Sequence, residues 1–169
     1  MTVATADLLK AVNTIWDASA LDAVFQALWD AGVVVAEFPV LHDVLAGGEQ
    51  PFPYCVFEVT EGTTTDRMSK GVNDVWETRD VPINFRVHAR DVDGDARSSK
   101  EIAADLAEEI MKVFGGHPTQ SPDTPSLDNG NFLIATYQND FAVREDEDHY
   151  VWTIGYNCRL DIPVMVTDV

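Results

Sequence analysis

Near the middle of the chain, apolar and polar residues alternate strictly over ten positions. The apolar set is Val81, Ile83, Phe85, Val87 and Ala89, and the intervening set is Pro82, Asn84, Arg86, His88 and Arg90. Successive side chains of a strand point to opposite faces of its sheet, so this stretch predicts a strand with one apolar and one basic face. The apolar face needs a cover, which predicts a sheet with helices packed on one side.

The remaining pattern predicts a single α+β domain over residues 1–169, built on a mostly antiparallel sheet. We expect helices at about 6–17, 20–31 and 97–114, where apolar residues recur at helical spacing. We expect strands at about 33–38, 54–60, 76–90, 131–143 and 149–161. Residues 61–75 carry little apolar content and predict an exposed, mobile hairpin arm or loop, whereas the proline-containing residues 115–130 predict a long irregular loop.

The charge of the chain excludes some classes of function. Lys and Arg number 11 against 29 Asp and Glu, for a net charge of −18. Affinity for nucleic acid comes chiefly from cations, so we expect no stable nucleic-acid binding. No apolar run is long enough to cross a bilayer, and the first residues lack the pattern of a secretory signal, so we expect a soluble intracellular protein that does not bind membranes.

Motifs that carry chemistry are missing from the sequence. Cys55 and Cys158 lie within apolar runs and are expected to be small buried hydrophobes. The histidines do not have metal-ligand spacing, and neither a phosphate-binding loop nor a serine nucleophile motif occurs. We therefore expect a protein that is not an enzyme, with no catalytic residue, no cofactor and no metal.

The cations are concentrated in the middle third of the chain, which suggests contact between unlike surfaces of neighbouring copies. The interface candidates are Arg67, Lys70, Trp76, Arg79, Arg86, His88 and Arg90. His88 lies between two arginines that would favour its neutral form, but the sequence shows no second group to act with it. We therefore expect His88 to have a structural role at a subunit contact. Ordinary solvated surfaces would explain the same cations.

Four segments follow one another along the chain. They are the strand Pro53-Tyr54-Cys55-Val56-Phe57, the polar arm, the alternating strand Val81 to Ala89, and the helix from Ser98 to Phe114 after an acidic turn. This order of segments resembles that of the tail-terminator and tail-completion proteins of long-tailed bacteriophages. The resemblance covers about residues 5 to 161. Two predicted helices at the start, where that family has one, and the loop at 115–130 depart from its pattern.

The resemblance implies a ring, usually a homohexamer, that caps the finished tail tube and meets the head–tail connector. Its partners would be further copies of itself, the tail tube protein and the connector protein. It would belong to the virion and be assembled in the cytoplasm of a bacterial host. The family has no catalytic residues to carry over, and an acidic lumen would repel DNA in transit. Two alternatives stay open: a small ligand-binding or enzymatic α+β domain, and an acidic adaptor that mimics DNA.

Overall fold

Three helices and six strands occupy the residues that the computed structural model describes, which are 3–29, 38–43, 50–60, 63–71, 74–115 and 133–164. The helices are α1 (Val3–Ala18), α2 (Leu21–Gln26) and α3 (Ser99–Phe114). The strands are β1 (Leu41–His42), β2 (Tyr54–Val59), β3 (Thr63–Gly71), β4 (Asp74–Arg90), β5 (Leu133–Arg144) and β6 (His149–Val164).

The strands form one sheet in the order β1-β2-β4-β6-β5, and β3 pairs with the first part of β4. β1 runs parallel to β2, and every other pairing is antiparallel. Phe85 of β4 lies between Phe57 of β2 and Ile154 of β6. The predicted α+β fold, with a mostly antiparallel sheet, is confirmed.

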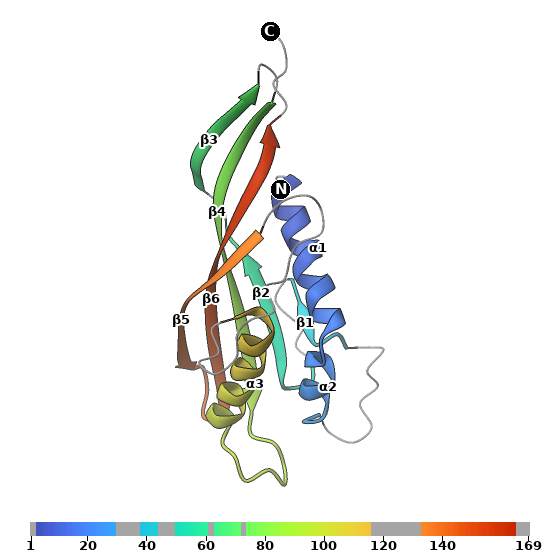
Figure 1. Ribbon diagram of the computed structural model, residues 1–169. Helices are drawn as coiled ribbons and strands as arrows, with labels where there is room; N and C mark the ends of the chain where they lie inside the picture. The colour runs from blue at the N-terminus through green and yellow to red at the C-terminus, as the bar shows by residue number, and fades with distance from the viewer. Residues whose placement is uncertain are drawn as a thin grey trace.

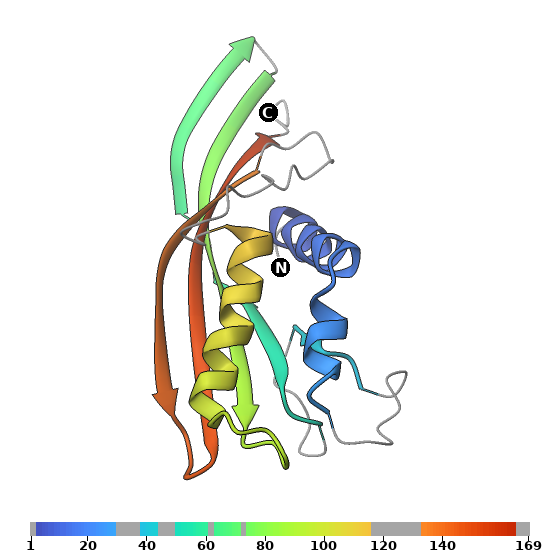
Figure 2. The ribbon, with the colours of Figure 1, turned by 60° about the horizontal axis from the view of Figure 1, so that its bottom comes forward.

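The alternation along β4 separates two faces, as predicted. The side chains from Val81 to Ala89 at odd positions are buried, and α1, α2 and α3 lie over the sheet on that side (Figures 1 and 2). The helices contribute to the same core the buried residues Leu8, Val12, Trp16, Leu21, Phe25, Ile102, Ala103, Leu106, Ala107, Ile110 and Phe114. Burial of this apolar surface is the main stabilising term of the fold.

Phe85 lies at the centre of this core. Its ring contacts those of Trp16, Phe57, Phe114 and Tyr156, with centroid separations of 6.3, 5.8, 4.7 and 5.9 Å. This side chain of β4 thus joins α1 and α3 to β2 and β6. Both cysteines are buried and free, as expected from the sequence.

The sheet continues beyond the part that the helices cover. β3, the first part of β4 and the end of β6 form an arm that projects past the helices (Figure 1). Residues 63–71 of the predicted arm form a strand paired with β4, which agrees with the hairpin alternative of the prediction and not with the loop; the pairing has two irregularities. Thr64 lies opposite Arg79, and Met68 lies opposite Trp76.

Several element boundaries differ from the prediction. The second helix was expected at 20–31 but ends at Gln26, and three-residue turns follow from Leu28 N to Phe25 O and from Trp29 N to Gln26 O. The Trp29 indole then donates to Pro53 O at 2.8 Å, which directs the chain towards β2. The prediction of helix was wrong for residues 27–29, where i→i−3 turns follow the helix, and residues 30 and 31 lie outside the described part of the chain.

Other predictions fall outside the description. Of the strand expected at 33–38, only Phe38 is described, and it lies in a bend. Of the loop expected at 115–130, only Gly115 is described.

The third helix begins one residue after its N-cap Ser98, whose hydroxyl and Glu101 form a capping box.

Candidate functional site

The side chains at even positions of β4 form the polar face predicted from the sequence. Arg86, His88 and Arg90 lie on the face opposite the helices, and their cross-strand neighbours on β2 are Val56 for Arg86 and Tyr54 for His88. Three of the predicted interface residues therefore share one surface. Arg79 does not join them.

Arg79 occupies an odd position of β4, so it faces the same side of the sheet as the helices. Its guanidinium Nη2 lies 2.9 Å from Glu77 Oε2. Arg67 lies on β3 opposite Glu77, Lys70 lies at an irregularity of the β3–β4 pairing, and Trp76 lies on β4 between Met68 and Pro163. The side chains of Arg67, Lys70 and Trp76 are outside the described residues.

Around His88, aromatic and imidazole rings pack into a cluster. The members of this His–aromatic cluster are Phe52, Tyr54, His88, Arg90 and His149. His88 stacks on Tyr54, with centroids 4.7 Å apart and planes 7° apart. Phe52 contacts Tyr54 at 5.0 Å and His149 at 5.1 Å, and the guanidinium of Arg90 lies 4.5 Å from the centre of the Phe52 ring. Such cation–π and stacking contacts fix the orientation of the rings.

The two histidines of the cluster contact each other directly. His88 Nδ1 and His149 Nε2 lie 3.2 Å apart, a hydrogen-bond distance. One of these nitrogens must carry a proton and the other must accept it, so the contact requires at least one neutral ring. His149 is therefore the second group that the sequence did not reveal. The antiparallel register places His149 opposite Arg90, close to His88, and only that register makes the two histidines neighbours.

Burial lowers the pKa of all three described histidines near this face. The pKa of His88 falls to about 4, first through burial and then through the nearby His149, Arg86 and His42. The pKa values of His149 and His42 are also lowered, chiefly by burial. His88 was expected to be neutral because of its flanking arginines. It is neutral at pH 7, but burial rather than an arginine is the largest cause.

Neutral imidazoles can accept hydrogen bonds or bind a transition metal. Within the described part of the chain, however, no group of three or more His, Cys, Asp or Glu side chains is arranged to hold a metal ion. The buried Nε2 atom of His42 has no hydrogen-bond partner in the structure. The His–aromatic cluster is thus a partly buried patch with one internal histidine bond.

Arg86 has an acidic partner on the neighbouring strand. Its Nη2 lies 2.8 Å from Glu58 Oε2, and both side chains are more than a third exposed. A pair with this exposure contributes little to stability, at most about 1 kcal/mol. Arg86 is therefore available to a partner surface without a large loss of folding free energy.

Comparisons with other proteins add no family assignment. No protein-family model matches this chain, and a search of the curated proteins gives no match. Among the described residues, no helix has the length and apolar character that a membrane span requires.

Proposed function

We propose that this protein is a non-enzymatic structural subunit that assembles into a ring of its own copies. The specific form of this proposal is that the ring is the tail-terminator or tail-completion ring of a long-tailed bacteriophage. Such a ring would lie at the neck, between the tail tube and the head connector. The observation that carries the proposal is the arm, together with the family resemblance of the sequence.

The arm extends the sheet beyond the helices that bury its core side (Figure 1). A sheet ribbon without a packed apolar face has little independent stability in water. No described helix covers the arm (Figure 1); contact with a neighbouring copy would cover it, and in a ring each arm would reach the next subunit. The ring would be a homohexamer if it follows the family that the sequence resembles.

The charge of the chain supports the same role. A subunit with a net charge of −18 can line a channel with carboxylates. Carboxylates repel the phosphates of DNA, so DNA could leave the head through such a ring without adhering to it. The passage of DNA through the ring would thus explain the acidic composition of the chain. The protein partners of the ring would be the tail tube protein and the connector protein.

Native mass spectrometry of the purified protein tests the ring directly, and negative-stain images test for a central hole. A mass of several subunits with an annular image supports the proposal. A monomer or dimer at every ionic strength between 0.01 and about 0.3 M would contradict it, because a closed ring needs more than two copies.

The non-enzymatic part of the proposal has its own test in His88. A His88→Ala variant is expected to form rings and to join tails in a complementation assay, because the imidazole contributes packing rather than chemistry. Rings that form normally but fail to join would reveal a specific recognition or chemical role for His88. His149→Ala is the matched control, because it removes the other half of the same contact.

A further inference from the structure

The His–aromatic cluster lies where three segments of the chain meet at one end of the sheet. His88 is near the end of β4, and His149 is the first residue of β6, paired with Arg90 of β4. Phe52 comes from the segment before β2, and its ring contacts that of His149. The hydrogen bond between the two imidazoles, at 3.2 Å, therefore joins the ends of two long strands beside a third segment.

The bond between the two imidazoles survives one added proton but not two. With both rings neutral, one nitrogen donates and the other accepts. If His149 gains a proton, its Nε2–H donates to Nδ1 of His88, and the bond persists with a charged donor. If His88 is then protonated as well, neither nitrogen can accept, and two positive charges lie at hydrogen-bond distance. The geometry of the pair therefore makes this contact sensitive to acid.

The groups around His88 disfavour a charge on its ring. β1 contributes His42, β2 contributes Tyr54, whose ring covers one face of the imidazole, and β4 contributes the guanidinium of Arg86. Burial is the largest cause that lowers the pKa of His88 to about 4, followed by its hydrogen-bonded partner, Arg86 and His42. Glu58 offsets part of the charge of Arg86, because the two side chains pair at 2.8 Å. A proton on this ring is therefore costly.

The acidic turn gives His149 a second set of partners. The backbone N–H groups of Glu145 and Asp146 donate to His149 O at 2.9 and 3.3 Å, so the turn folds back on this residue. Burial and then Arg90 lower the pKa of His149, whereas the carboxylates of the turn act in the opposite direction; these are Glu145, Asp148 and Asp146. His149 therefore takes the first proton, and its charged ring is attracted to the turn.

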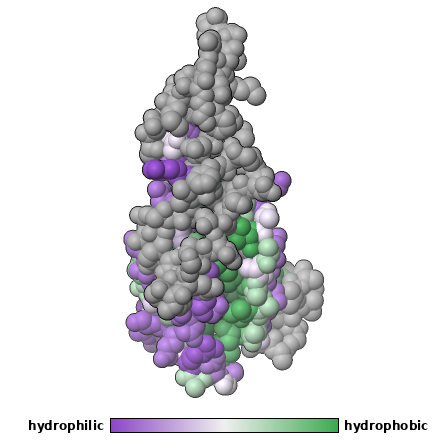
Figure 3. Space-filling view, viewed as in Figure 1, coloured by the Kyte–Doolittle hydropathy of each residue, from purple (hydrophilic) through white to green (hydrophobic). Residues whose placement is uncertain are grey.

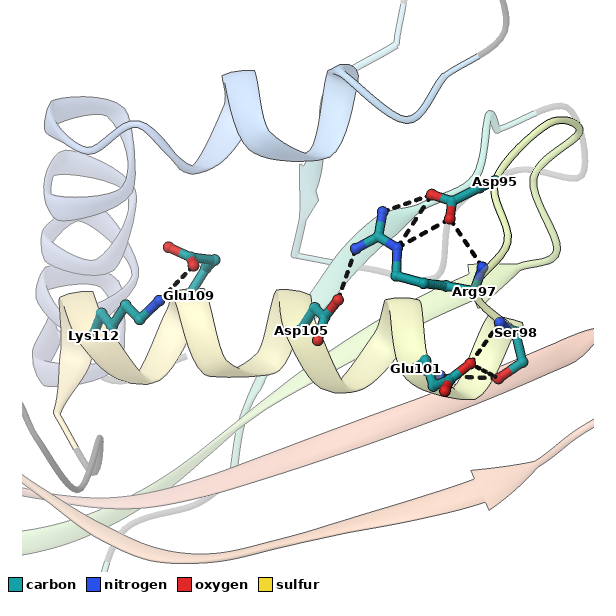
Figure 4. Close-up of polar contacts among 7 residues, drawn as sticks. All are labelled: Asp95, Arg97, Ser98, Glu101, Asp105, Glu109 and Lys112. Carbon is teal, nitrogen blue, oxygen red and sulfur yellow. Dashed lines mark hydrogen bonds and ion pairs between the residues drawn. The ribbon is translucent and has the colours of Figure 1, made fainter.

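The charged contacts on the helical side are built differently. Figure 3 shows this side, where hydrophilic residues border a green apolar strip. Arg97 lies 2.6 Å from Asp95 and 2.7 Å from Asp105, and Lys112 lies 2.6 Å from Glu109 (Figure 4). Each contact joins a cation to a carboxylate, so acid breaks it only by protonating the carboxylate. The hydrogen bonds from Arg97 lower the pKa of Asp95 to about 2. The histidine bond therefore responds to acid before the Arg97–Asp95 pair does.

We propose that the His88–His149 bond is an acid-sensitive latch that holds the start of β6 against the end of β4. The latch is closed while at least one of the two rings is neutral. It opens when both rings are protonated: the His149 imidazolium turns towards the carboxylates of the 145–148 turn, and the last residues of β4 separate from the first residues of β6. Phe52 then loses its contact with His149. Opening changes the shape and charge of the polar face of β4, while the apolar core beneath the helices stays packed.

Hydrogen exchange of the backbone amides between pH 6.5 and about 4 tests the latch. Protection factors, which correct for the pH dependence of the exchange chemistry, are compared for two parts of the β4–β6 pairing. The end of the sheet is residues 88–90 and 149–151, and its core is residues 83–85 and 154–156. Opening that binds one further proton changes the opening constant by about tenfold per pH unit. We expect protection at the end of the sheet to fall at least about tenfold, and protection in the core to change less.

Two glutamine variants keep a hydrogen bond at this place while removing one titrating ring. His88→Gln supplies a carbonyl oxygen that accepts from His149, and His149→Gln supplies an N–H that donates to His88. In each variant at most one member of the pair can become charged, so the loss of protection in acid is expected to disappear. His42→Gln is the matched control, because His42 packs on Tyr54 of the same cluster but is not bonded to the pair. This control is expected to open like the parent protein.

The acidic turn is tested by removing the charges that attract His149. In the double variant Glu145→Gln and Asp148→Asn, the charged ring loses two of its partners, so opening is expected to shift to lower pH. Glu147→Gln is the matched control in the same turn, since the pKa of His149 is shifted by the other three carboxylates of the turn. Its opening is expected at the pH of the parent protein.

Three results would overturn the latch. If the parent protein keeps its protection at the end of the sheet, acid does not open it. If protection falls equally at the end and in the core, acid unfolds the whole domain instead. If His88→Gln loses as much protection as the parent protein, the histidine bond is not the contact that acid breaks. All the contacts of the latch lie within one chain, so none of these results bears on the proposed ring.

Discussion

Strand β4 passes through two regions of the molecule that differ in how they are held together. In the body, its odd-numbered residues from Val81 to Ala89 lie beneath three helices and are almost fully buried. In the arm, its first residues pair with β3 and β6 but extend past the helices (Figure 1). The pairing of β4 with β6 continues through both regions, whereas the helices cover only the body.

The difference indicates which region determines folding and which is suited to assembly. Apolar burial stabilises the body, because each buried large side chain contributes about 1.5–3 kcal/mol. The arm has strand pairing, whose net contribution per hydrogen bond is smaller. We therefore expect changes in the body to act on stability and changes in the arm to act on association.

The largest effect on stability is expected for Phe85→Ala in the body. Phe85 is fully buried among four other aromatic rings, so its removal leaves a cavity and should cost about 3–5 kcal/mol of unfolding free energy. Urea denaturation followed by tryptophan fluorescence measures this loss. Arg86→Ala is the control on the opposite face of the same strand, with an expected cost of at most about 1 kcal/mol. Equal costs for the two variants would contradict the assignment of the two faces.

Deletion of residues 63–74 is expected to abolish ring formation while leaving a folded monomer. The deletion removes β3, residues 72 and 73 and the first residue of β4, but none of the described core residues. Its effect on the free energy of unfolding should be smaller than that of Phe85→Ala. Native mass spectrometry and thermal denaturation measure the two quantities separately. If the deleted protein forms the same oligomer, the arm is not an interface.

A smaller effect is expected from pH, through the histidines of the sheet. The folded-state pKa of His88 is lowered to about 4 from 6.5, so the unfolded chain binds protons before the native protein does. His88 therefore leaves the free energy of unfolding at its full value above about pH 6.5, and this free energy decreases as the pH falls from 6.5 towards 4. Urea denaturation across this interval measures the slope.

His88→Gln provides the matched control for the pH effect, because glutamine does not titrate. The variant should show a shallower loss of unfolding free energy between pH 6.5 and 4. The lowered pKa of Asp95, at about 2, acts only at more acidic pH, because its stabilising effect is lost below the ordinary carboxyl range. An unchanged slope in His88→Gln would show that His88 is not part of the acid response.

The smallest effect is expected from salt, which should strengthen association by a few fold up to moderate concentration. Copies with a net charge of −18 repel one another, and the Debye length falls from roughly 30 Å at 0.01 M to about 10 Å at 0.1 M salt. Sedimentation velocity across this range measures the assembled fraction. Tightest assembly at the lowest salt would mean that attraction between oppositely charged patches of neighbouring copies outweighs the overall repulsion.

Local signals predicted much of the fold. The alternation from Val81 to Ala89 predicted which face of β4 is buried, and the helical stripe of α3 was predicted to within two residues of its start. Both signals reside in the spacing of neighbouring residues, so they can be read without knowing what packs against them. The end of α2 was predicted too late: the apolar stripe continues to Leu28 and Trp29, but turns replace the helix after Gln26, and Trp29 bonds to Pro53, which is distant in sequence.

The candidate surfaces depended more on long-range pairing. Arg86, His88 and Arg90 could be identified as one polar face because they share a strand. The contact between His88 and His149 joins residues 61 positions apart, and it depends on the pairing of β4 with β6. No local sequence pattern contains this contact. The register of β6 against β4 would have indicated it.

The sequence by itself determined the class of fold, the buried face of the central strand and the strong negative charge, because these depend on residue type and local periodicity. Only the tertiary structure decided that the arm contains a paired strand and that two histidines distant in sequence meet. The physical reason is that strand register and helix docking are selected by the free energy of the whole core, and each sets the position of residues far apart in the chain.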